Sequence, residues 1–557
     1  MATLEPCWLD ELAEVALSDQ STTAINTGSW KSIAPRYEDK LPPCSELCPA
    51  GNDISKVLLL LAKSDVAGAA KLLRTTNPIP ATLGRVCPHF CESHCNRDGF
   101  GGSIAVHMLE RFLGDYSLAD VTDMELRPSS KSGKTVAVIG AGPAGISAAY
   151  ALTLKGHEVQ VFDDKPKPGG YLRTGIPDYR LPKTTLDREI ALAERVGVKF
   201  RPNTRVGRDI TIDSLQNQFH AVIVAVGLHK SRALDVPGAD HPNVYSGVDL
   251  LESILGGEAP KLPRVVAVIG GGNTAIDVAR SVLRLGVKPI VVYRRTEKEM
   301  PAISSEVEEA KKEGVKFQFL ATPAQVVTQN GDLIALDCQK MKLGNPDSSG
   351  RRTPVAIPNE KFRIEVSGVI VATGELPDLS FVRKENENYE GYFFAGDVAT
   401  GQGTVAAAVG HGLQVAASVD SYLRTGNRQP ELPDLRRLWG RNVNVKKVAA
   451  AELLNPAYFH AQPRPAITTI QHRLAPTTFD EIVQGFELQE ARSEARRCLS
   501  CGTCNECLNC YYWCPDIAVH REPHNGGLTI DSMHCKGCGI CVEECPRSAM
   551  SMGEVQR

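Results

Sequence analysis

The stretch Lys134-Thr-Val-Ala-Val-Ile-Gly140-Ala-Gly142-Pro-Ala-Gly145 decides the fold of this 557-residue chain. Its apolar first half predicts a short buried parallel strand, which runs through a G-x-G-x-x-G turn into a helix. Such a turn lets the backbone approach a pyrophosphate, and the helix N-terminus stabilises the phosphate charge. The next predicted strand, residues 158–162, ends at Asp163, where an acidic side chain accepts hydrogen bonds from a ribose diol. The pattern therefore predicts a Rossmann-like domain that binds a dinucleotide.

The same strand, turn and helix recur in Arg264-Val-Val-Ala-Val-Ile-Gly270-Gly-Gly272-Asn273-Thr274-Ala275. Here the next predicted strand, residues 289–293, ends on Arg294 and Arg295 instead of an acid. Two guanidinium groups at this position can clamp a 2′-phosphate, so the pair favours NADP(H) over NAD(H). Two other interpretations stay open: a solvent-exposed basic pair, and an arginine that lies over an adenine ring.

The last eight cysteines form two copies of a CxxCxxCxxxCP run, a spacing that wraps a 4Fe-4S cubane. In ferredoxins with two such clusters, the fourth cysteine of each run binds the other cluster. A zinc ribbon or a disulfide framework would not repeat this run. We therefore expect two clusters, one on Cys504, Cys507, Cys510 and Cys545 and the other on Cys535, Cys538, Cys541 and Cys514.

The remaining cysteines fall into three groups. Five lie between residues 44 and 95, at Cys44, Cys48, Cys87, Cys91 and Cys95. Cys338 is the only cysteine between Cys95 and Cys498, which excludes a redox dithiol in the second dinucleotide domain, because a dithiol needs two sulfurs. We expect Cys338 and Cys7 to be packed or surface thiols. Cys498 and Cys501 stand just before the first ferredoxin run, as spare thiols or as an alternative ligand pair.

The composition is that of a soluble globular protein, with 42% hydrophobic residues, 23% charged residues and a net charge of -3. This balance favours neither nucleic acid nor a membrane surface. The sequence shows no targeting leader and no apolar run long enough to span a bilayer. Most of the 17 cysteines cluster at metal-ligand spacings, which suits a reducing compartment. We therefore expect a cytoplasmic protein of about three or four domains.

Two phrases, together with the N-terminal cysteines, carry a family resemblance. They are PGGYLRTGIPDYRLP, from Pro168 to Pro182, and YRRTEKEMP, from Tyr293 to Pro301. With them, the chain from about residue 30 to 430 and the lead-in at 495–502 resembles the small subunit of glutamate synthase and its relatives. These relatives include the N-terminal part of dihydropyrimidine dehydrogenase and flavoproteins fused to ferredoxin modules. The C-terminal module, with its Cys-Tyr-Tyr-Trp-Cys-Pro phrase, resembles the delta-type ferredoxin subunit of 2-oxoacid:ferredoxin oxidoreductases.

The resemblance implies an α/β fold with two nested Rossmann-like dinucleotide-binding domains, one for FAD and one for NADP. An N-terminal helical iron–sulfur domain and a C-terminal α+β bacterial-type ferredoxin domain would flank them. Strands at 220–227 and 368–374 would be the paired hinge strands that enter and leave the nicotinamide domain. The expected boundaries are 1–130 for the helical domain, 131–245 with 365–430 for the split FAD domain, 246–364 for the NAD(P)H domain, 431–490 for a linker and 491–557 for the ferredoxin domain.

A third segment, Tyr392-Phe-Phe-Ala-Gly396-Asp397 followed by Gly401-Gln-Gly-Thr404-Val405-Ala406, resembles the C-terminal FAD signature of this family. The resemblance implies that Asp397 holds the ribityl–phosphate region of the flavin. It also implies that the small-residue helix after Thr404 points its N-terminus at the isoalloxazine. Taken alone, the segment fits an ordinary buried strand and turn.

Fuller members of the family bind two clusters in the helical domain, but the CxxC upstream of the first cysteine is missing here. Three ligands of one family cluster are matched by Cys48, Cys87 and Cys91. Glu110 stands where the non-cysteine fourth ligand of that cluster lies. Cys44 and Cys95 match ligands of the lost cluster, and either could supply the fourth bond instead. We expect one N-terminal 4Fe-4S cluster with an open fourth ligand; the alternative is a relic domain that binds no metal or tolerates zinc.

The residues expected to contact FAD or NAD(P)H belong to the two glycine turns, the strand ends that follow them and the family phrases. They are Gly140, Gly142, Pro143, Ala144, Gly145, Asp163, Gly170, Arg180, Gly270, Gly272, Asn273, Thr274, Arg294, Arg295, Gly374, Gly396, Asp397, Thr404, Val405 and Ala406. No catalytic acid or base is expected, because hydride transfer between two bound rings depends on positioning.

These features predict an electron-transfer oxidoreductase subunit that passes electrons between NAD(P)H and an iron–sulfur partner enzyme via FAD and 4Fe-4S clusters, in either direction. We expect a heteromeric complex with catalytic subunits of a 2-oxoacid oxidoreductase or a similar reductase, without nucleic acid or membrane. Two alternatives stay open. One is a glutamate synthase small subunit, against which the appended ferredoxin argues, and the other is a non-catalytic redox sensor.

Overall fold

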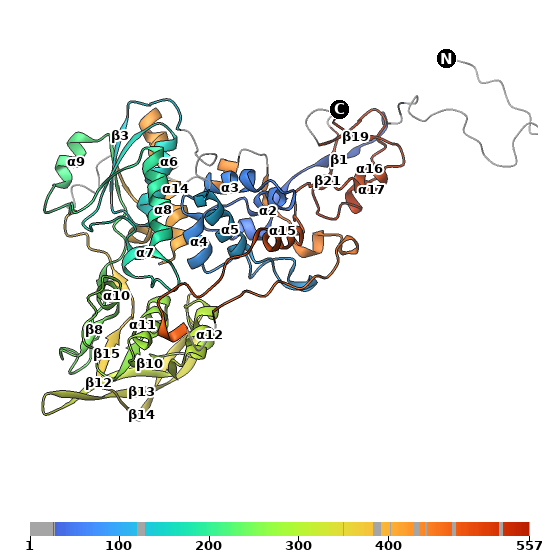
Figure 1. Cartoon of the computed structure of the whole chain (residues 1–557). Coiled ribbons are helices and arrows are strands. Elements are labelled where there is room, and N and C mark those ends of the chain that lie inside the picture. Colours follow the sequence, from blue (N-terminus) through green and yellow to red (C-terminus); the bar gives the residue numbers. More distant parts are fainter. Residues whose placement is uncertain are drawn as a thin grey trace, which may run out of the picture.

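The computed structural model describes residues 26, 28–119, 128–348, 350–382, 391–401, 403–427, 434–439, 443–470, 475–522 and 527–555. Cys7 lies outside these ranges. Figure 1 shows two sheet domains, a helical domain beside the first of them and a ferredoxin domain beyond the helical one. Within the described ranges, no helix is both long and apolar enough to cross a membrane.

The first sheet carries the first glycine turn. Its domain contains β3 (Thr135–Ile139), α6 (Pro143–Leu154), β4 (Glu158–Phe162), α7 (Tyr171–Thr174), α8 (Lys183–Val196), β5 (Lys199–Arg201), α9 (Ile212–Gln218), β6 (Ala221–Val224), β17 (Tyr392–Phe394), α13 (Asp397–Thr400) and α14 (Val405–Thr425). The strands are parallel in the order β17-β6-β3-β4-β5, and Val136 on β3 pairs with Val159 on β4 and Ala221 on β6. The central strands β3 and β6 are buried on both faces, as a parallel sheet covered by helices requires.

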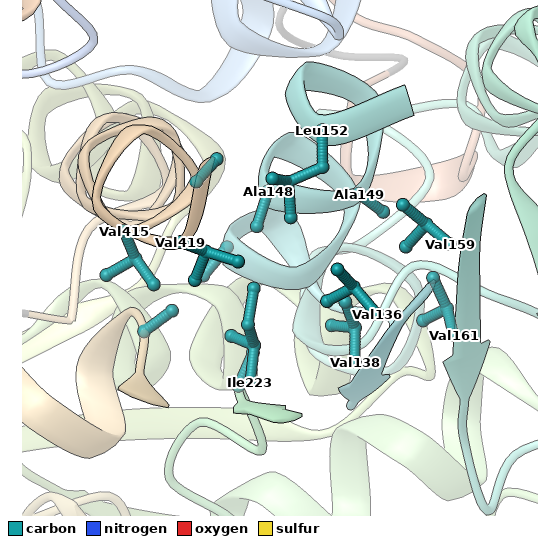
Figure 2. Packing of buried hydrophobic residues seen from close by; sticks show 14 of the residues in the cluster. Val136, Val138, Ala148, Ala149, Leu152, Val159, Val161, Ile223, Val415 and Val419 are labelled. Carbon is teal, nitrogen blue, oxygen red and sulfur yellow. The ribbon is translucent and has the colours of Figure 1, made fainter. Parts of the chain in front are cut away.

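The core of this domain lies between the sheet and two helices. Figure 2 shows valine and isoleucine side chains of β3, β4 and β6 facing Ala148 and Leu152 of α6 and Val415 and Val419 of α14. Small residues on α6 let α14 pack closely against it. Full burial of each branched side chain contributes about 1.5–3 kcal/mol. This packing holds the starts of both helices, α6 and α14, beside the carboxyl ends of the strands.

The second sheet carries the second glycine turn and has the parallel order β11-β10-β9-β15-β8. Its domain contains β8 (Val244–Ser246), α10 (Gly247–Leu255), β9 (Val265–Ile269), α11 (Asn273–Arg284), β10 (Lys288–Tyr293), α12 (Ser304–Glu313), β11 (Lys316–Phe319) and β15 (Gly368–Val371). A three-stranded antiparallel sheet extends from it: β12 (Ala321–Gln329), β13 (Asp332–Pro346) and β14 (Arg352–Glu365).

The chain passes between the two sheets at a different place from the one expected. The strand in 220–227 belongs to the first sheet and the strand in 368–374 to the second, so they do not pair as hinge strands. Instead β7 (Lys230–Ser231) and β16 (Glu375–Leu376) form the antiparallel crossing pair. Because β8 and β15 both join the second sheet, we propose domain limits near residues 232 and 374 in place of 245 and 365.

The helical domain is built from segments at both ends of the chain. It contains β2 (Lys40–Leu41), α1 (Pro43–Glu46), α2 (Ile54–Ala62), α3 (Val66–Arg74), α4 (Pro80–Val86), α5 (Val106–Ala119) and, from the C-terminal part, α15 (Leu488–Arg496). Ala491 and Ala495 of α15 are buried in one core with Leu58 of α2 and Leu109 of α5. Residues 488–496 were expected at the linker–ferredoxin boundary, and the structure packs them into the helical domain.

The ferredoxin domain likewise uses both ends of the chain. It contains β1 (Ile33–Tyr37), α16 (Asn509–Tyr512), β19 (Val519–Arg521), β20 (Leu528–Ile530), α17 (Ile540–Glu543) and β21 (Met550–Glu554). β1 runs antiparallel to β21, with Tyr37 opposite Met550. The strand β1, expected within the helical domain of residues 1–130, therefore belongs to the sheet of the ferredoxin domain.

The described parts of the segment predicted as a linker lie along the surface of the other domains. It includes η6 (Leu435–Trp439), β18 (Asn444–Val448), η7 (Ala451–Leu453), η8 (Pro456–Tyr458) and η9 (Ala475–Thr477). β18 pairs with β2 of the helical domain. Further on, the backbone N–H of Ile482 donates to the Tyr179 carbonyl at 3.1 Å, where the two sheet domains meet. The segment therefore joins three domains.

Candidate functional site

A cavity of about 400 Å³ lies at the carboxyl ends of the first sheet and is lined from both sheet domains. The predicted residues that line it are Gly140, Gly142, Pro143, Ala144, Asp163, Gly170, Thr274, Asp397, Thr404 and Val405. The predicted residues outside its lining are Gly145, Arg180, Gly270, Gly272, Asn273, Arg294, Arg295, Gly374, Gly396 and Ala406. The three sequence segments chosen for FAD thus meet in one space.

The first glycine turn has the shape that a pyrophosphate needs. Gly140 has φ +104°, and a Cβ there would lie 2.4 Å from the Ala225 carbonyl oxygen, so only glycine fits. Gly142, which precedes α6, is open: a Cβ there would meet no atom of the described chain within 4 Å. The turn is therefore packed against Ala225 at Gly140 and open to a ligand at Gly142, where α6 presents its N-terminus.

Asp163 ends β4, as predicted, and its carboxylate shapes the glycine turn. Its Oδ2 accepts from the backbone N–H of Ala141 at 2.6 Å, and its Oδ1 accepts from that of Lys165 at 2.9 Å. Burial raises the pKa of Asp163, although both hydrogen bonds act in the opposite direction. Each oxygen keeps a further lone pair. Asp163 can therefore support the turn and accept hydrogen bonds from a ribose.

Asp397 supplies a second test of fit for a bound flavin nucleotide. Burial raises the pKa of its carboxyl group. Its Oδ1 is buried and has no hydrogen-bond partner among the described residues. Since buried polar atoms are nearly always hydrogen-bonded, this oxygen marks a place where a ligand can supply a donor. Beside it, the Gly396 backbone N–H donates to His411 Nδ1 at 2.8 Å, which fixes the Gly-Asp turn.

Thr274, just after the second glycine turn, lines the same cavity, whereas Gly270 and Gly272 do not. A Cβ on Gly272, like one on Gly142, would meet no atom of the described chain within 4 Å. Thr274, in the first turn of α11, lines the cavity and accepts a hydrogen bond from Tyr171 Oη at 3.2 Å. Asn273 points elsewhere, since its Oδ1 accepts from the Ile303 backbone N–H at 2.9 Å. Tyr171 therefore stands between the two dinucleotide turns.

The two arginines after β10 have different surroundings. Arg295 is 6% exposed, its Nε donates to the Arg352 carbonyl at 2.7 Å, and its NH2 group pairs with Asp347 at 2.8 Å. Arg294 is exposed. The predicted two-arginine clamp is therefore reduced to Arg294, because Arg295 holds the β13–β14 loop.

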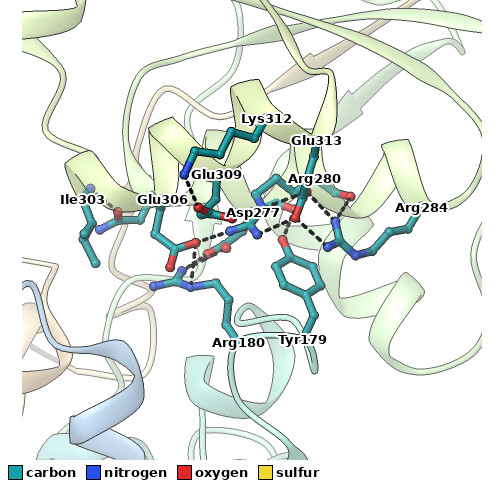
Figure 3. Close-up of polar contacts among 11 residues, drawn as sticks. Tyr179, Arg180, Asp277, Arg280, Arg284, Ile303, Glu306, Glu309, Lys312 and Glu313 are labelled. Atoms are coloured by element: carbon teal, nitrogen blue, oxygen red, sulfur yellow. Dashed lines mark hydrogen bonds and ion pairs between the residues drawn. The ribbon is translucent and has the colours of Figure 1, made fainter. Parts of the chain in front are cut away.

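Arg180 lies at the contact between the sheet domains and not in the cavity. Its NH1 group pairs with both carboxylate oxygens of Asp277 on α11, at 2.8 and 2.9 Å. Figure 3 shows this pair within a larger group that includes Arg280, Arg284 and Glu313. The Arg284 guanidinium lies 3.8 Å from the centre of the Tyr179 ring. Arg180 does not line the cavity, and its contacts suit a role in holding the two domains together.

A separate, mostly apolar cavity in the helical domain brings together four of the predicted metal ligands: Cys48, Cys87, Cys91 and Glu110. Glu110 is held by two amides, since Asn77 Nδ2 and Asn52 Nδ2 both donate to its Oε1, at 2.6 and 3.1 Å. Burial raises the pKa of Glu110 to about 8. Ala406 of α14 lines the same cavity, although it was expected at the flavin.

The other two predicted N-terminal ligands lie elsewhere. Cys44 and Cys95 do not line the cavity of Cys48. They pack against the helical core together with Cys498. Asn96 Nδ2 donates to Cys501 Sγ at 3.4 Å, which places Cys501 beside the same group. The geometry therefore favours Glu110 as the fourth ligand of the first N-terminal site.

The ferredoxin domain contains two cavities, each walled by four cysteines. One is lined by Cys504, Cys507, Cys510 and Cys545, and the other by Cys514, Cys535, Cys538 and Cys541. This is the crossed arrangement that the spacing predicts. The sulfurs accept hydrogen bonds: the Ala518 N–H lies 3.3 Å from Cys514 Sγ, and the Ala549 N–H lies 3.4 Å from Cys545 Sγ. Such bonds stabilise cluster thiolates.

The spacing of the sulfurs separates clusters from single zinc ions. Ligand sulfurs around one zinc ion lie about 3.8 Å apart, as tetrahedral bonds of about 2.3 Å require. Across the described part of the chain, no three cysteine sulfurs lie within 4.8 Å of one another. The cysteine groups are too wide for one ion, and they suit the larger cubane that the runs predict.

His89, Glu92 and His107 do bring ligand atoms within 4.8 Å of one another. Their contacts explain this without a metal. His107 Nδ1 and Glu92 Oε1 are 2.6 Å apart, Arg464 pairs with Glu92 at 2.7 Å, and the two imidazole rings stack at 4.0 Å. Burial raises the pKa of Glu92, but the hydrogen bond from His107 and the charges of His107, His89 and Arg464 together outweigh it and lower the pKa to about 2. A zinc site at these histidines is therefore not favoured.

Several residues at these sites were not among the predicted site residues. Asn52 and Asn77 position Glu110, Tyr171 bridges the two glycine turns, and the hydroxyl group of Tyr37 lies 3.3 Å from Cys510 Sγ. Asn52 follows a Cys-Pro-Ala-Gly turn, which was a usable local signal. Tyr37 is far from Cys510 in the sequence, so only the pairing of β1 with β21 reveals it.

Residues 134–412 match the family model of the pyridine nucleotide-disulphide oxidoreductases. This chain belongs to that family. Residues 35–121 match the model of dihydropyrimidine dehydrogenase domain II, 4Fe-4S cluster, and residues 528–551 match a 4Fe-4S binding domain. The protein is therefore an NAD(P)H-dependent iron–sulfur flavoprotein oxidoreductase that carries FAD and 4Fe-4S clusters.

Three characterised relatives share most of the chain. The NADP(+)-dependent formate dehydrogenase subunit beta of Moorella thermoacetica is 36% identical over 505 residues, which cover 82% of this chain and 70% of the relative. The NADPH-Fe(3+) oxidoreductase subunit beta of Geobacter sulfurreducens is 32% identical and covers 84% of this chain and 76% of its own. The glutamate synthase [NADPH] small chain of Azospirillum brasilense is 31% identical, with 70% and 88% covered.

Proposed function

We propose that this oxidoreductase is the NAD(P)H-linked subunit of a heteromeric iron–sulfur enzyme and that it exchanges electrons with a catalytic subunit through its ferredoxin domain. The start of α14 carries this proposal. Thr404 and Val405 line the flavin cavity, and the next residue, Ala406, lines the cavity of Cys48, Cys87, Cys91 and Glu110. One turn of helix thus forms a wall common to the two-electron and one-electron sites.

The cofactors supply the redox chemistry: nicotinamide and flavin exchange a hydride, and flavin and clusters exchange single electrons. The chain supplies the positions. Gly142 of the first turn and Thr274, just after the second turn, line one cavity, so two dinucleotides can approach each other there. Tyr171 and Thr274 mark where the two turns meet, because their side chains are hydrogen-bonded across the domain contact. Fixed, water-excluding placement of the two rings is what hydride transfer requires.

We propose that the partner docks on the ferredoxin domain. The segment between Cys510 and Cys514 presents Tyr512 at 74% and Trp513 at 54% exposure. Cys507 and Cys538, one from each ferredoxin cavity, are also exposed. Exposed aromatic side chains beside a redox site are typical of a protein interface. By likeness to the delta-type ferredoxin subunits, the partner would be a 2-oxoacid oxidoreductase or a similar iron–sulfur reductase.

The three relatives named above are subunits or chains of larger enzymes, which supports a heteromeric complex. A glutamate synthase small subunit is the second candidate, since that relative is covered over 88% of its length. The ferredoxin domain argues against it, because its two cavities suit a chain that delivers electrons to a partner through its own clusters.

Anaerobic purification of the tagged chain from its native host tests the proposal. The wild-type protein should reduce an artificial dye with NADPH and retain an iron–sulfur partner subunit. Changing Tyr512→Glu with Trp513→Glu should keep the dye activity and release the partner. Val355→Glu, at an exposed site on β14, is the control and should change neither. Absence of NADPH-dependent dye reduction in the wild type would contradict the function, and retention of the partner by the double variant would contradict the docking surface.

A further inference from the structure

Cys44, Cys95, Cys498 and Cys501 line none of the three cysteine cavities described above. The first two come from the helical domain, and the last two follow α15 near the other end of the sequence. Cys44, Cys95 and Cys498 nonetheless pack against one hydrophobic core. Asn96, the neighbour of Cys95, donates from Nδ2 to Cys501 Sγ at 3.4 Å. All four residues therefore meet at one place in the fold.

The segment that carries Cys498 and Cys501 is fastened to the helical domain on both sides. Before it, Glu494 Oε1 accepts from the Ala105 backbone N–H at 2.7 Å. Arg497 pairs with Glu494 at 2.7 Å and donates to the carbonyls of Gly101 and Gly102 at 3.0 and 2.8 Å. After it, the Lys40 backbone N–H donates to the Gly502 carbonyl at 2.8 Å. These buried contacts fix the two thiols against Cys44 and Cys95.

The four thiols are close enough to interact electrostatically. Cys44 interacts in this way with Cys498, Cys95 and Cys501, and Cys501 interacts with Cys498 and Cys95. Nearby thiolates disfavour each other's charge unless a positive centre lies among them.

Local hydrogen bonds suit bound thiolates. The Ser500 backbone N–H donates to Cys498 Sγ at 3.4 Å, and Ser500 has φ +51°, which closes a tight turn between the two cysteines. Together with the Asn96 amide, this gives N–H donors to both C-terminal sulfurs. N–H donors directed at cysteine sulfur are a feature of cluster sites. The sulfurs are too far apart for one zinc ion, since no three cysteine sulfurs in the described part of the chain lie within 4.8 Å of one another.

We propose that Cys44, Cys95, Cys498 and Cys501 hold a further 4Fe-4S cluster, with two ligands from the N-terminal part of the chain and two from the segment after α15. The structure thereby gives a role to the cysteine pair that stands outside the ferredoxin runs. The proposal rests on the electron-transfer function above and completes its route.

The position of this site is between the others. Cys501 and Cys504 are three residues apart, so their Cα atoms lie within about 11 Å, and Cys504 lines a ferredoxin cavity. Cys91 and Cys95 are four residues apart, within about 14 Å, and Cys91 lines the cavity beside α14. The proposed cluster therefore bridges the flavin-side cluster and the ferredoxin domain.

Iron, sulfide, zinc and flavin analysis of the anaerobically purified holoprotein, with native mass spectrometry, tests the proposal. Four cubanes predict about 16 Fe per chain, whereas three predict about 12. Changing Cys498→Ala with Cys501→Ala should remove about a quarter of the iron while the flavin content stays constant. Cys44→Ala alone should cause the same loss, since it removes a ligand from the opposite side of the site. Cys338→Ala, at a buried thiol on β13, should keep all the iron.

About 12 Fe in the wild type, or one zinc per chain at an otherwise complete iron content, would overturn the additional cluster. Neither result would touch the proposed function, provided that NADPH still reduces the flavin and the dye. Conversely, about 16 Fe without NADPH-dependent reduction would support the site and contradict the function. The two claims therefore fail separately.

Discussion

Of the two arginines after β10, Arg294 is the exposed one that can meet a 2′-phosphate. Its neighbour Arg295 is committed to Asp347 and to the Arg352 carbonyl. The sequence pattern could predict two arginines at the end of the strand, but not that Arg295 is buried and Arg294 exposed. That choice depends on the β13–β14 loop, whose residues lie about 50 positions later and carry no motif.

Changing Arg294→Gln should therefore weaken the binding of NADPH without weakening the binding of NADH. Loss of a charged hydrogen bond to phosphate costs about 1.5–3 kcal/mol, so the KM for NADPH should rise about 10-fold or more. The measurement is steady-state dye reduction with each nucleotide.

Arg295→Gln is the matched control. It should lower stability, because Asp347 loses its partner, and it should affect both nucleotides alike. Selective loss of NADPH in Arg295→Gln, with an unchanged Arg294→Gln, would reverse the assignment.

At the scale of elements, two glycines let α14 pack closely against two neighbours, the segment at Pro49 and the helix α6. A Cβ on Gly410 would lie 1.8 Å from the Pro49 carbonyl oxygen, next to Cys48. A Cβ on Gly412 would lie 2.3 Å from the Ala144 carbonyl oxygen of α6. An alanine at either position would push α14 away from its neighbour and lower the free energy of unfolding by about 1–3 kcal/mol.

We therefore expect Gly410→Ala to reduce the iron content of the helical domain while FAD is retained. Gly412→Ala should reduce the FAD content while the iron of the helical domain is retained. Iron and flavin analysis of both variants, purified in parallel, measures this. Equal losses of iron and flavin in the two variants would show that α14 does not separate the sites.

Glu38 joins three strands from distant parts of the chain. Its carboxylate accepts from Asn444 Nδ2 at 2.9 Å beside β18, from Ser551 Oγ at 2.8 Å on β21 and from Lys447 Nζ at 3.1 Å. The Asn444 bond contributes most to lowering the pKa of Glu38, which falls from 4.5 to about 2. Because the folded pKa is the lower one, the carboxylate stabilises the fold above about pH 4.5, and this is lost as the pH falls toward 2.

Glu38→Gln should reduce the free energy of unfolding by about 1 kcal/mol near neutral pH, a modest value because the site is partly solvated. Urea unfolding followed by cluster absorbance should give the same loss at pH 8 and at pH 6, since both lie above the ordinary pKa. Glu158→Gln, at an exposed ion pair on β4, should change little. A loss that vanishes already at pH 6 would contradict the depressed pKa.

Local patterns predicted the parts of this molecule whose chemistry is local. The glycine turns, the strand ends and the crossed ferredoxin ligands each depend on spacings of a few residues, and Gly142, Asp163 and Cys545 lie where those spacings place them. The position of Cys498 beside Cys44 could not be predicted in the same way. It follows from α15 packing on α2, a contact between segments about 430 residues apart, for which the sequence has no periodic signal.

At the scale of the whole molecule, a buried charged group fixes the two dinucleotide domains together. Arg180 of the first domain pairs with Asp277 of the second, and both are buried. Around them, Arg280 and Arg284 pair with Glu313, and the C-terminal segment covers Tyr179 through Ile482 (Figure 3). These buried ion pairs therefore hold the two domains in their relative positions.

Asp277→Ala should lower the free energy of unfolding by about 3–5 kcal/mol, because it leaves the Arg180 charge buried and unpaired. The double change Arg180→Leu with Asp277→Leu should cost clearly less, since it removes both charges. Chemical denaturation followed by flavin fluorescence measures both. A double variant as unstable as Asp277→Ala would show that packing, and not the unpaired charge, sets the cost.

The direct test of the account is an anaerobic rapid-mixing experiment on the complete holoprotein with NADPH, in which flavin absorbance and cluster electron paramagnetic resonance are followed together. We predict that the flavin bleaches first and that reduced-cluster signals then appear without any other reductant. Flavin that bleaches while the clusters stay oxidised, although dithionite can reduce them, would contradict electron transfer from the flavin cavity into the cysteine sites.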